Sequence, residues 1–151
     1  MKTGNVLVAA ACGTAAMTLF SYLVSRNKNK DFREPQLLGK MIYRAVPDIE
    51  KPPAKVIGWI LHCATGLTFA IIYGYLLKDT KLRSNLPDGV VLGLVNGVVA
   101  VGIWKATFSL HPDPPQIHFK DFYKHLVLAH IVFATTTLLI LDGKKRSEVE
   151  G

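Results

Sequence analysis

Four apolar blocks, at residues 4–25, 56–77, 89–110 and 122–141, constrain the fold of this chain more than any other feature. Each holds about 20 residues, which as a helix gives about 30 Å, the thickness of the hydrocarbon layer of a bilayer. Only helices and closed barrels satisfy their backbone hydrogen bonds in lipid, and these blocks are too long and too evenly apolar for barrel strands. The sequence therefore predicts an all-α polytopic membrane protein with four transmembrane helices in a single membrane domain.

The charged residues lie between and beside these blocks, and they sum to a net charge of +7. Lysine and arginine side chains beside apolar spans are attracted to anionic lipid head groups. Lys124, near the start of the fourth block, is long enough to reach the head groups from inside the span. The sequence has no basic helix with interleaved aromatic residues, so the expected partner is the lipid bilayer and not nucleic acid.

A short amphipathic helix is expected at about 35–46, within the loop that covers residues 26–55. Pro35 suits the start of a helix, and Pro47 follows its end. The two faces of this helix are an apolar side with Leu37, Leu38, Met41, Ile42 and Ala45 and a polar side with Gln36, Lys40 and Arg44. This pattern is typical of a helix that lies in the membrane–water interface. At the other end of the chain, residues 142–151 are expected to form a polar tail.

Small residues recur four positions apart in the second and third blocks. In lipid, helices associate through close backbone approach, because no hydrophobic force drives them together. The residues expected to pack helices are Gly58, Gly66, Ala70 and Gly74 in the second block and Gly89, Gly93 and Gly97 in the third. Two such rows in consecutive spans predict tight packing of these two helices on each other, and self-association is a further expectation.

Three of the polar side chains inside the spans are candidates for a functional site: His62, Asn96 and His130. Such groups are costly in lipid and normally face the interior of a bundle. The favoured interpretation is that each imidazole bonds to a neighbouring helix, through Thr65, Asn96 or a backbone carbonyl. Two alternatives stay open. His62, Asn96 and His130 together line a path for a proton or solute, or the two histidines ligate a haem axially across the bundle.

The loop over residues 111–121 holds a candidate metal site. If a helix begins near Pro115, then His118, Asp121 and His125 lie on one face at relative positions i, i+3 and i+7. Two imidazoles and a carboxylate can bind a transition metal. The favoured alternative is an interfacial start to the fourth span, anchored in the membrane surface by the aromatic residues Phe119, Phe122 and Tyr123.

Catalytic patterns are missing from the sequence. It contains no nucleophile elbow, no phosphate-binding loop, no paired carboxylates within the spans and no cysteine–histidine–acid set. No acidic residue lies inside any of the four blocks. We therefore expect neither an enzyme nor a resident cofactor, and the lack of acidic residues also weighs against an ion-coupled transporter.

Three segments carry a resemblance: a first span rich in small residues that ends "AMTLFSYLVS", the second span "GWILHCATGLTFAIIYG" and the last span "HLVLAHIVFAT". With these the chain resembles the small four-span membrane proteins of unknown function found in bacteria. It departs from their pattern at Ala134, where a glycine would be expected. The resemblance implies a multi-pass protein of the bacterial cytoplasmic membrane, and it implies no activity.

The orientation follows from the distribution of lysine and arginine. The loops 26–55 and 111–121, together with the span ends beside them, carry more basic residues than the opposite side. The positive-inside rule therefore favours these two loops as cytoplasmic. For function, the first hypothesis is a non-enzymatic interaction or accessory protein, which forms homo-oligomers if the small-residue rows self-associate. The alternative is a small channel or transporter for a proton, metal ion or small solute, and the third is a haem-binding electron carrier.

Overall fold

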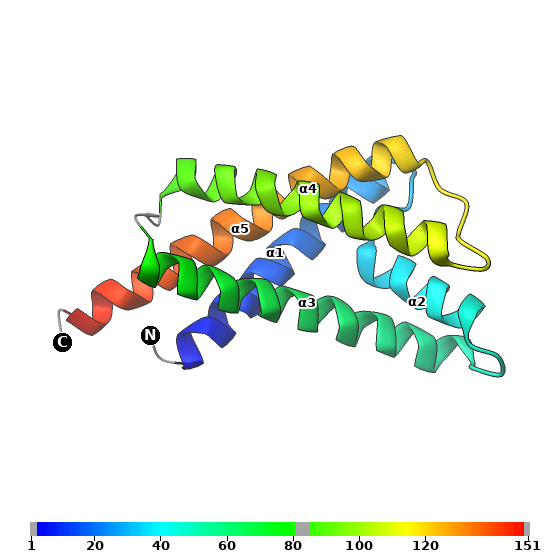
Figure 1. The fold of residues 1–151 in the computed structure, drawn as a ribbon, viewed down its shortest axis with the longest axis horizontal. Coiled ribbons are helices and arrows are strands. Elements are labelled where there is room, and N and C mark those ends of the chain that lie inside the picture. Colours follow the sequence, from blue (N-terminus) through cyan, green and yellow to red (C-terminus); the bar gives the residue numbers. More distant parts are fainter. Residues whose placement is uncertain (1–2, 81–84, 150–151) are drawn as a thin grey trace.

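The computed structural model describes residues 3–80 and 85–149, and within these ranges all regular structure is helical. The helices are α1 (Thr3–Lys28), α2 (Glu34–Ala45), α3 (Lys51–Asp79), α4 (Leu86–Leu110) and α5 (Phe119–Val149) (Figure 1). Proline stands in the first turn of α2, α3 and α4, where its missing N–H costs no hydrogen bond. The Asn85 side chain also caps α4, since it accepts a hydrogen bond of 2.8 Å from the Asp88 N–H.

Four of the helices are long and apolar enough to cross a membrane: α1, α3 as far as Lys78, α4, and α5 from Phe119 to Leu141. The chain is thus an all-helical, multi-pass membrane protein by the length and composition of its helices. Each predicted span lies within one of them. The expected polar tail is not a separate segment, because α5 continues through it to Val149. Residues 150–151 of that tail lie outside the described residues.

Helix α2 occupies the place of the expected amphipathic helix, and it packs against the first turns of α3 (Figure 1). Leu37 and Met41 on its apolar side are buried. The two backbones meet closely at Gly39 and Gly58. A Cβ atom added at Gly58 would lie 2.5 Å from both the Gly39 nitrogen and the Pro35 carbonyl oxygen. Glycine at position 58 is therefore what allows α2 to lie directly on α3.

Helix α5 runs between α4 and α1 and packs on both, while α3 packs on α1 and α2 (Figure 1). The glycine row of α4 faces α5, since Cβ atoms at Gly89, Gly93 and Gly97 would collide with the backbone or side chains of Thr135, Ile131 and Val127. In α3, Gly66 faces Thr14 of α1, and Ala70 and Gly74 are buried.

The predicted tight packing of residues 56–77 on residues 89–110 is wrong, because α3 and α4 form no helix–helix interface in the described part of the chain. A groove of small residues favours close approach without specifying which helix fills it. Here α5 fills the groove of α4, because Val127, Ile131 and Thr135 are also spaced four residues apart. Side chains still link α3 to α4, through the hydrogen bond between Tyr73 and Asn96.

The buried apolar side chains form two clusters. One joins α1, α3 and α5 around Tyr73 and Phe133, and the other joins α2, α4 and α5 around Trp104 and Phe122. Aromatic rings dominate the second cluster, where Trp104 meets Phe122 edge to face with ring centroids 5.2 Å apart. Polar side chains gather at the junction of the two clusters, and that junction contains the candidate site.

Candidate functional site: a cavity that opens between α3 and α4

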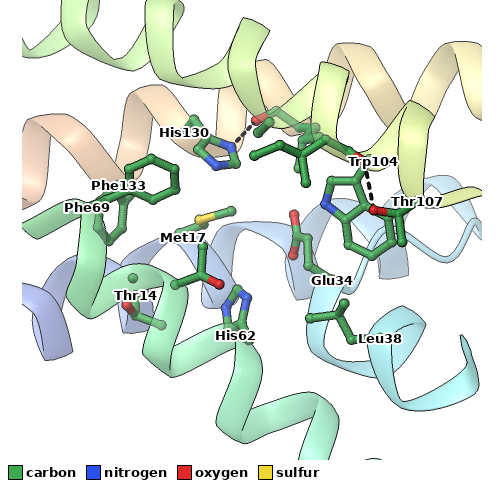
Figure 2. Close-up of a pocket in the computed structure, with 15 residues that line it drawn as sticks. Thr14, Met17, Glu34, Leu38, His62, Phe69, Trp104, Thr107, His130 and Phe133 are labelled. Carbon is green, nitrogen blue, oxygen red and sulfur yellow. Dashed lines mark hydrogen bonds between the residues drawn. The ribbon is translucent and has the colours of Figure 1, made fainter. Parts of the chain in front are cut away.

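A cavity of about 130 Å³ lies where the two apolar clusters meet, and all five helices contribute to its wall (Figure 2). Helix α3 supplies His62 and Thr65, and α4 supplies Ile103 and Trp104. Because α3 and α4 do not pack on each other, and because Thr65 and Ile103 are exposed, the cavity opens on the surface of the bundle between these two helices. Most of its wall is apolar or aromatic, and its polar groups come from a few side chains.

Glu34, the first residue of α2, is the acidic residue of this wall. Its side chain is directed toward the space enclosed by His62, His130 and Trp104 (Figure 2), and the residue is only 2% exposed. The carboxylate oxygen Oε1 accepts a hydrogen bond of 3.0 Å from the Ser21 hydroxyl, while Oε2 is buried and has no hydrogen-bond partner among the described residues. Burial raises the pKa of Glu34 to about 8, since a carboxylate without a full countercharge is costly in an apolar interior.

His125 of α5 also approaches the Glu34 carboxyl. Its Nε2 atom lies 2.9 Å from the Ser21 hydroxyl oxygen and 3.7 Å from Oε1 of Glu34. Since the Ser21 hydroxyl donates to Glu34, it accepts from His125, and the imidazole proton is therefore on Nε2. The ring is stacked between Phe20 and Phe32, with centroid distances of 5.2 and 4.8 Å. This packing fixes the ring on Ser21.

His62 of α3 bonds to α1. Its Nε2 atom lies 2.9 Å from the Thr18 hydroxyl oxygen, and its ring meets Trp59 edge to face. The expected interaction with a neighbouring helix is therefore formed, although Thr65 is not the partner. The Thr65 hydroxyl donates instead to the Leu61 carbonyl of its own helix.

His130 of α5 lies across the cavity from His62 (Figure 2). Its Nδ1 atom is 2.8 Å from the Leu126 carbonyl oxygen. A carbonyl only accepts, so the proton of the neutral ring is on Nδ1, and Nε2 keeps a free electron pair. His130 thus contributes a hydrogen-bond acceptor. The sequence predicted that both histidines face the interior of the bundle, and the structure brings them to one cavity.

Asn96 does not line the cavity. Its side-chain nitrogen donates a hydrogen bond of 2.9 Å to the Tyr73 hydroxyl, so it ties α4 to α3 inside the bundle. Both residues are buried. The predicted grouping of Asn96 with the two histidines is therefore not formed, and its position supports a structural role.

The expected metal triad is not formed either. His118 is exposed and precedes α5, which begins at Phe119 rather than near Pro115. Asp121 forms an ion pair with Lys30, and His125 is directed inward to Ser21. The three side chains therefore do not converge on a common point where they could hold a metal ion. In the described ranges, no group of three histidine, cysteine or acidic side chains is placed to hold a metal ion.

Sequence reasoning missed Glu34, because the residue lies outside all four apolar blocks. A signal was present nonetheless. Glu34 stands three and seven positions before Leu37 and Met41, on the apolar face of α2. A carboxyl group that shares the buried face of an amphipathic helix has to enter the protein interior with it.

The comparisons of this chain with family models, with curated proteins and with solved structures gave no match.

Proposed function

We propose that this chain is a multi-pass interaction or accessory protein of the bacterial cytoplasmic membrane, and that it acts by binding rather than by bond chemistry. The observation that carries the proposal is the open flank between α3 and α4. Both helices carry large apolar side chains that are exposed, and Ile103 of α4, which is 56% exposed, lies at the opening of the cavity between them. An unpaired flank of this kind suits contact with lipid or with another membrane helix.

Two of the three candidate polar side chains in the spans support the same role, since His62 and Asn96 bond to neighbouring helices, whereas His130 bonds within its own helix α5. His62 bonds to Thr18 across α3 and α1, and Asn96 bonds to Tyr73 across α4 and α3. Each bond fixes the relative position of two helices. A rigid bundle with such internal links is suited to present a constant surface to a partner.

Native mass spectrometry of the protein in mild detergent tests the proposal. We expect a homo-oligomer or a co-purified membrane protein, and an Ile103→Ser variant at the opening between α3 and α4 should weaken it. Leu7→Ser and Leu19→Ser on α1 form the matched control, since these side chains are also large and exposed. A monomer that binds no membrane protein would contradict the interaction role.

A small channel or transporter for a proton or small solute is the second candidate. The favouring observation is that Glu34, His62 and His130 line one cavity. Carboxyl and imidazole groups can pass protons, and ionisable groups inside helical bundles often mark such paths. The metal-ion form of this hypothesis has no support from the described residues.

Proton flux into vesicles that contain a pH-sensitive dye separates the two candidates. The transporter predicts a flux that Glu34→Gln abolishes, while the interaction role predicts no flux and a loss of thermal stability in His62→Phe. The third hypothesis, a haem carrier, is disfavoured, because a cavity of about 130 Å³ is well below the roughly 300–1,000 Å³ of typical ligand pockets. An absorbance spectrum with a Soret band would restore it.

The position of α2 in the interface also belongs to this proposal. Charged residues gather where α1 ends and α5 begins, with ion pairs of Lys30 with Asp121 and of Asp31 with Lys40. A layer of charged residues at this end of the bundle suits the head-group region of a membrane. A spin label at Tyr43→Cys on the exposed side of α2 should then be accessible both to oxygen and to a water-soluble nickel chelate, whereas accessibility to the chelate alone would place α2 in water.

A further inference from the structure

The unpaired oxygen of Glu34 is the feature that points to a ligand. Oε2 is buried, lacks a hydrogen-bond partner in the described part of the chain, and belongs to a side chain that faces the cavity (Figure 2). Leaving a buried polar atom unpaired costs about 1–3 kcal/mol, and more if the group is charged. Protein interiors therefore supply such atoms with a partner, either water or a ligand.

The chemistry of the wall selects the kind of ligand. His130 offers the free electron pair of Nε2, and ionised Glu34 offers Oε2, so the cavity presents two acceptors. Among the residues that the structure describes, no lysine or arginine lines it. An anion would thus meet no permanent positive charge, whereas an ammonium group would meet a carboxylate and a second acceptor. The nearby ring of Trp104 also favours a cation.

The size and opening of the cavity limit the shape of the ligand. Its volume of about 130 Å³ is close to that of an apolar cavity known to hold benzene, about 150 Å³, so it accepts a group of about six non-hydrogen atoms. Thr65 and Ile103 are exposed at the opening between α3 and α4. A longer apolar chain would leave the cavity there and lie on the surface of the bundle.

We propose that the cavity binds an amphiphilic primary amine, with the ammonium group between Oε2 of Glu34 and Nε2 of His130 and the alkyl chain directed toward the opening between α3 and α4. This assignment goes beyond the proposed interaction role and does not depend on it.

Proton exchange should accompany binding. Burial raises the pKa of Glu34 to about 8, so the free carboxyl is mostly protonated at pH 7 and releases its proton when it pairs with an ammonium ion. The titratable groups that face Glu34 are His62 from α3, His125 and His130 from α5, and Asp31 from its own segment. The affinity of the cavity for the amine should therefore rise from pH 7 to pH 9. Over this range the amine itself stays protonated, because the usual pKa of an alkylamine is about 10.4.

Calorimetric titration of the full chain in a non-ionic detergent tests the proposal. The probes are hexylamine, the neutral hexanol and the anionic hexanoate, each corrected for uptake by empty micelles. We expect one saturable site for hexylamine with at least a tenfold preference over hexanol. Equal binding of hexylamine and hexanol, tighter binding of hexanoate, or no saturable binding, which would mean that water alone fills the cavity, each overturns the proposal.

Two variants locate the site. Glu34→Gln keeps the size of the side chain and should remove the preference for hexylamine, while Asp113→Asn, at a carboxyl group that is 68% exposed, should leave it unchanged. A preference that survives Glu34→Gln overturns the proposal. If Glu34→Gln fails to fold, the comparison of the three probes on the unmodified protein still tests whether the cavity prefers an amine. The oligomer measurement described above tests the interaction role separately, whatever the outcome of the titrations.

Discussion

At the scale of single residues, Glu34 determines the chemistry of the bundle interior. The Ser21 hydroxyl binds one of its oxygens and leaves the other unpaired. Burial raises the pKa of this carboxyl from its ordinary value of 4.5 to about 8. Folding therefore takes up a proton at any pH between these two values, because the unfolded chain is ionised there and the folded chain is not.

The stability of the bundle should consequently fall as the pH rises from 4.5 through about 8. We expect the melting temperature of the unmodified protein in detergent to drop from pH 6 to pH 9, and Glu34→Gln, neutral at every pH, to lose much less over that range. Asp113→Asn serves as the control and should follow the unmodified protein. Equal losses in the Glu34→Gln and unmodified proteins would show that burial does not perturb this carboxyl.

Asn96 and Tyr73 provide a second test at this scale. Their hydrogen bond is buried between α4 and α3, which otherwise have little contact. Tyr73→Phe should cost about 1 kcal/mol, in the range measured for hydrogen bonds between membrane helices. In the background of Asn96→Leu the same change should cost close to nothing, because its partner is already gone. Additive losses in the double variant would mean that the two side chains act independently.

At the scale of the elements, close backbone contact holds the helices together. Helix α4 lies against α5 along Gly89, Gly93 and Gly97, and α3 lies against α2 at Gly58. A Cβ atom at Gly93 would lie 2.9 Å from the His130 carbonyl oxygen and the Ile131 nitrogen, which are backbone atoms and cannot turn away. The separation of these helices is thus determined by the absence of a side chain.

Gly93→Ala should therefore destabilise the bundle, by about 1–3 kcal/mol as for other overpacked interiors. Gly102 on the same helix is the matched control, since a Cβ there would have no atom within 4 Å. Gly102→Ala should leave the protein as stable as before or slightly more stable, because alanine favours helix over glycine. Thermal unfolding followed by circular dichroism compares the two, and similar melting temperatures would refute the packing role of Gly93.

At the scale of the whole molecule, four long helices connect through segments that alternate between the two ends of the bundle (Figure 1). The end of α1 and the loop before α5 lie at one end, and the end of α3 and the start of α4 lie at the other (Figure 1). If all four helices cross the membrane, positions at these two ends lie on opposite sides of it.

Labelling with an impermeant thiol reagent tests this arrangement. In a background with Cys12→Ala and Cys63→Ala, we expect Lys28→Cys and Asp113→Cys to be protected in intact cells and Lys78→Cys to be labelled, if loops 26–55 and 111–121 are cytoplasmic as we propose. The reverse pattern would keep the four spans and invert the orientation. Labelling of Lys28→Cys and Lys78→Cys from the same side would contradict the four-span fold itself.

The sequence by itself determined the helices of this protein. Blocks of about 20 apolar residues must satisfy their backbone hydrogen bonds within one segment if they enter lipid, and this requirement is local. Local sequence patterns likewise predicted the extent of α2, with Pro35 near its start, and the inward position of His62 and His130. Attention to the apolar blocks alone missed Glu34, which lies outside all of them, although its spacing from Leu37 and Met41 on α2 was a local signal of burial.

Only the tertiary structure decided which helices meet. The glycines of α4 formed a groove that any helix with suitably spaced side chains could fill, and α5 rather than α3 fills it. That choice leaves α3 and α4 apart and opens the cavity between them, with Glu34 carried into it by the packing of α2 on α3. Pairing of this kind depends on the sum of many weak contacts between distant segments, which no local pattern of residues encodes.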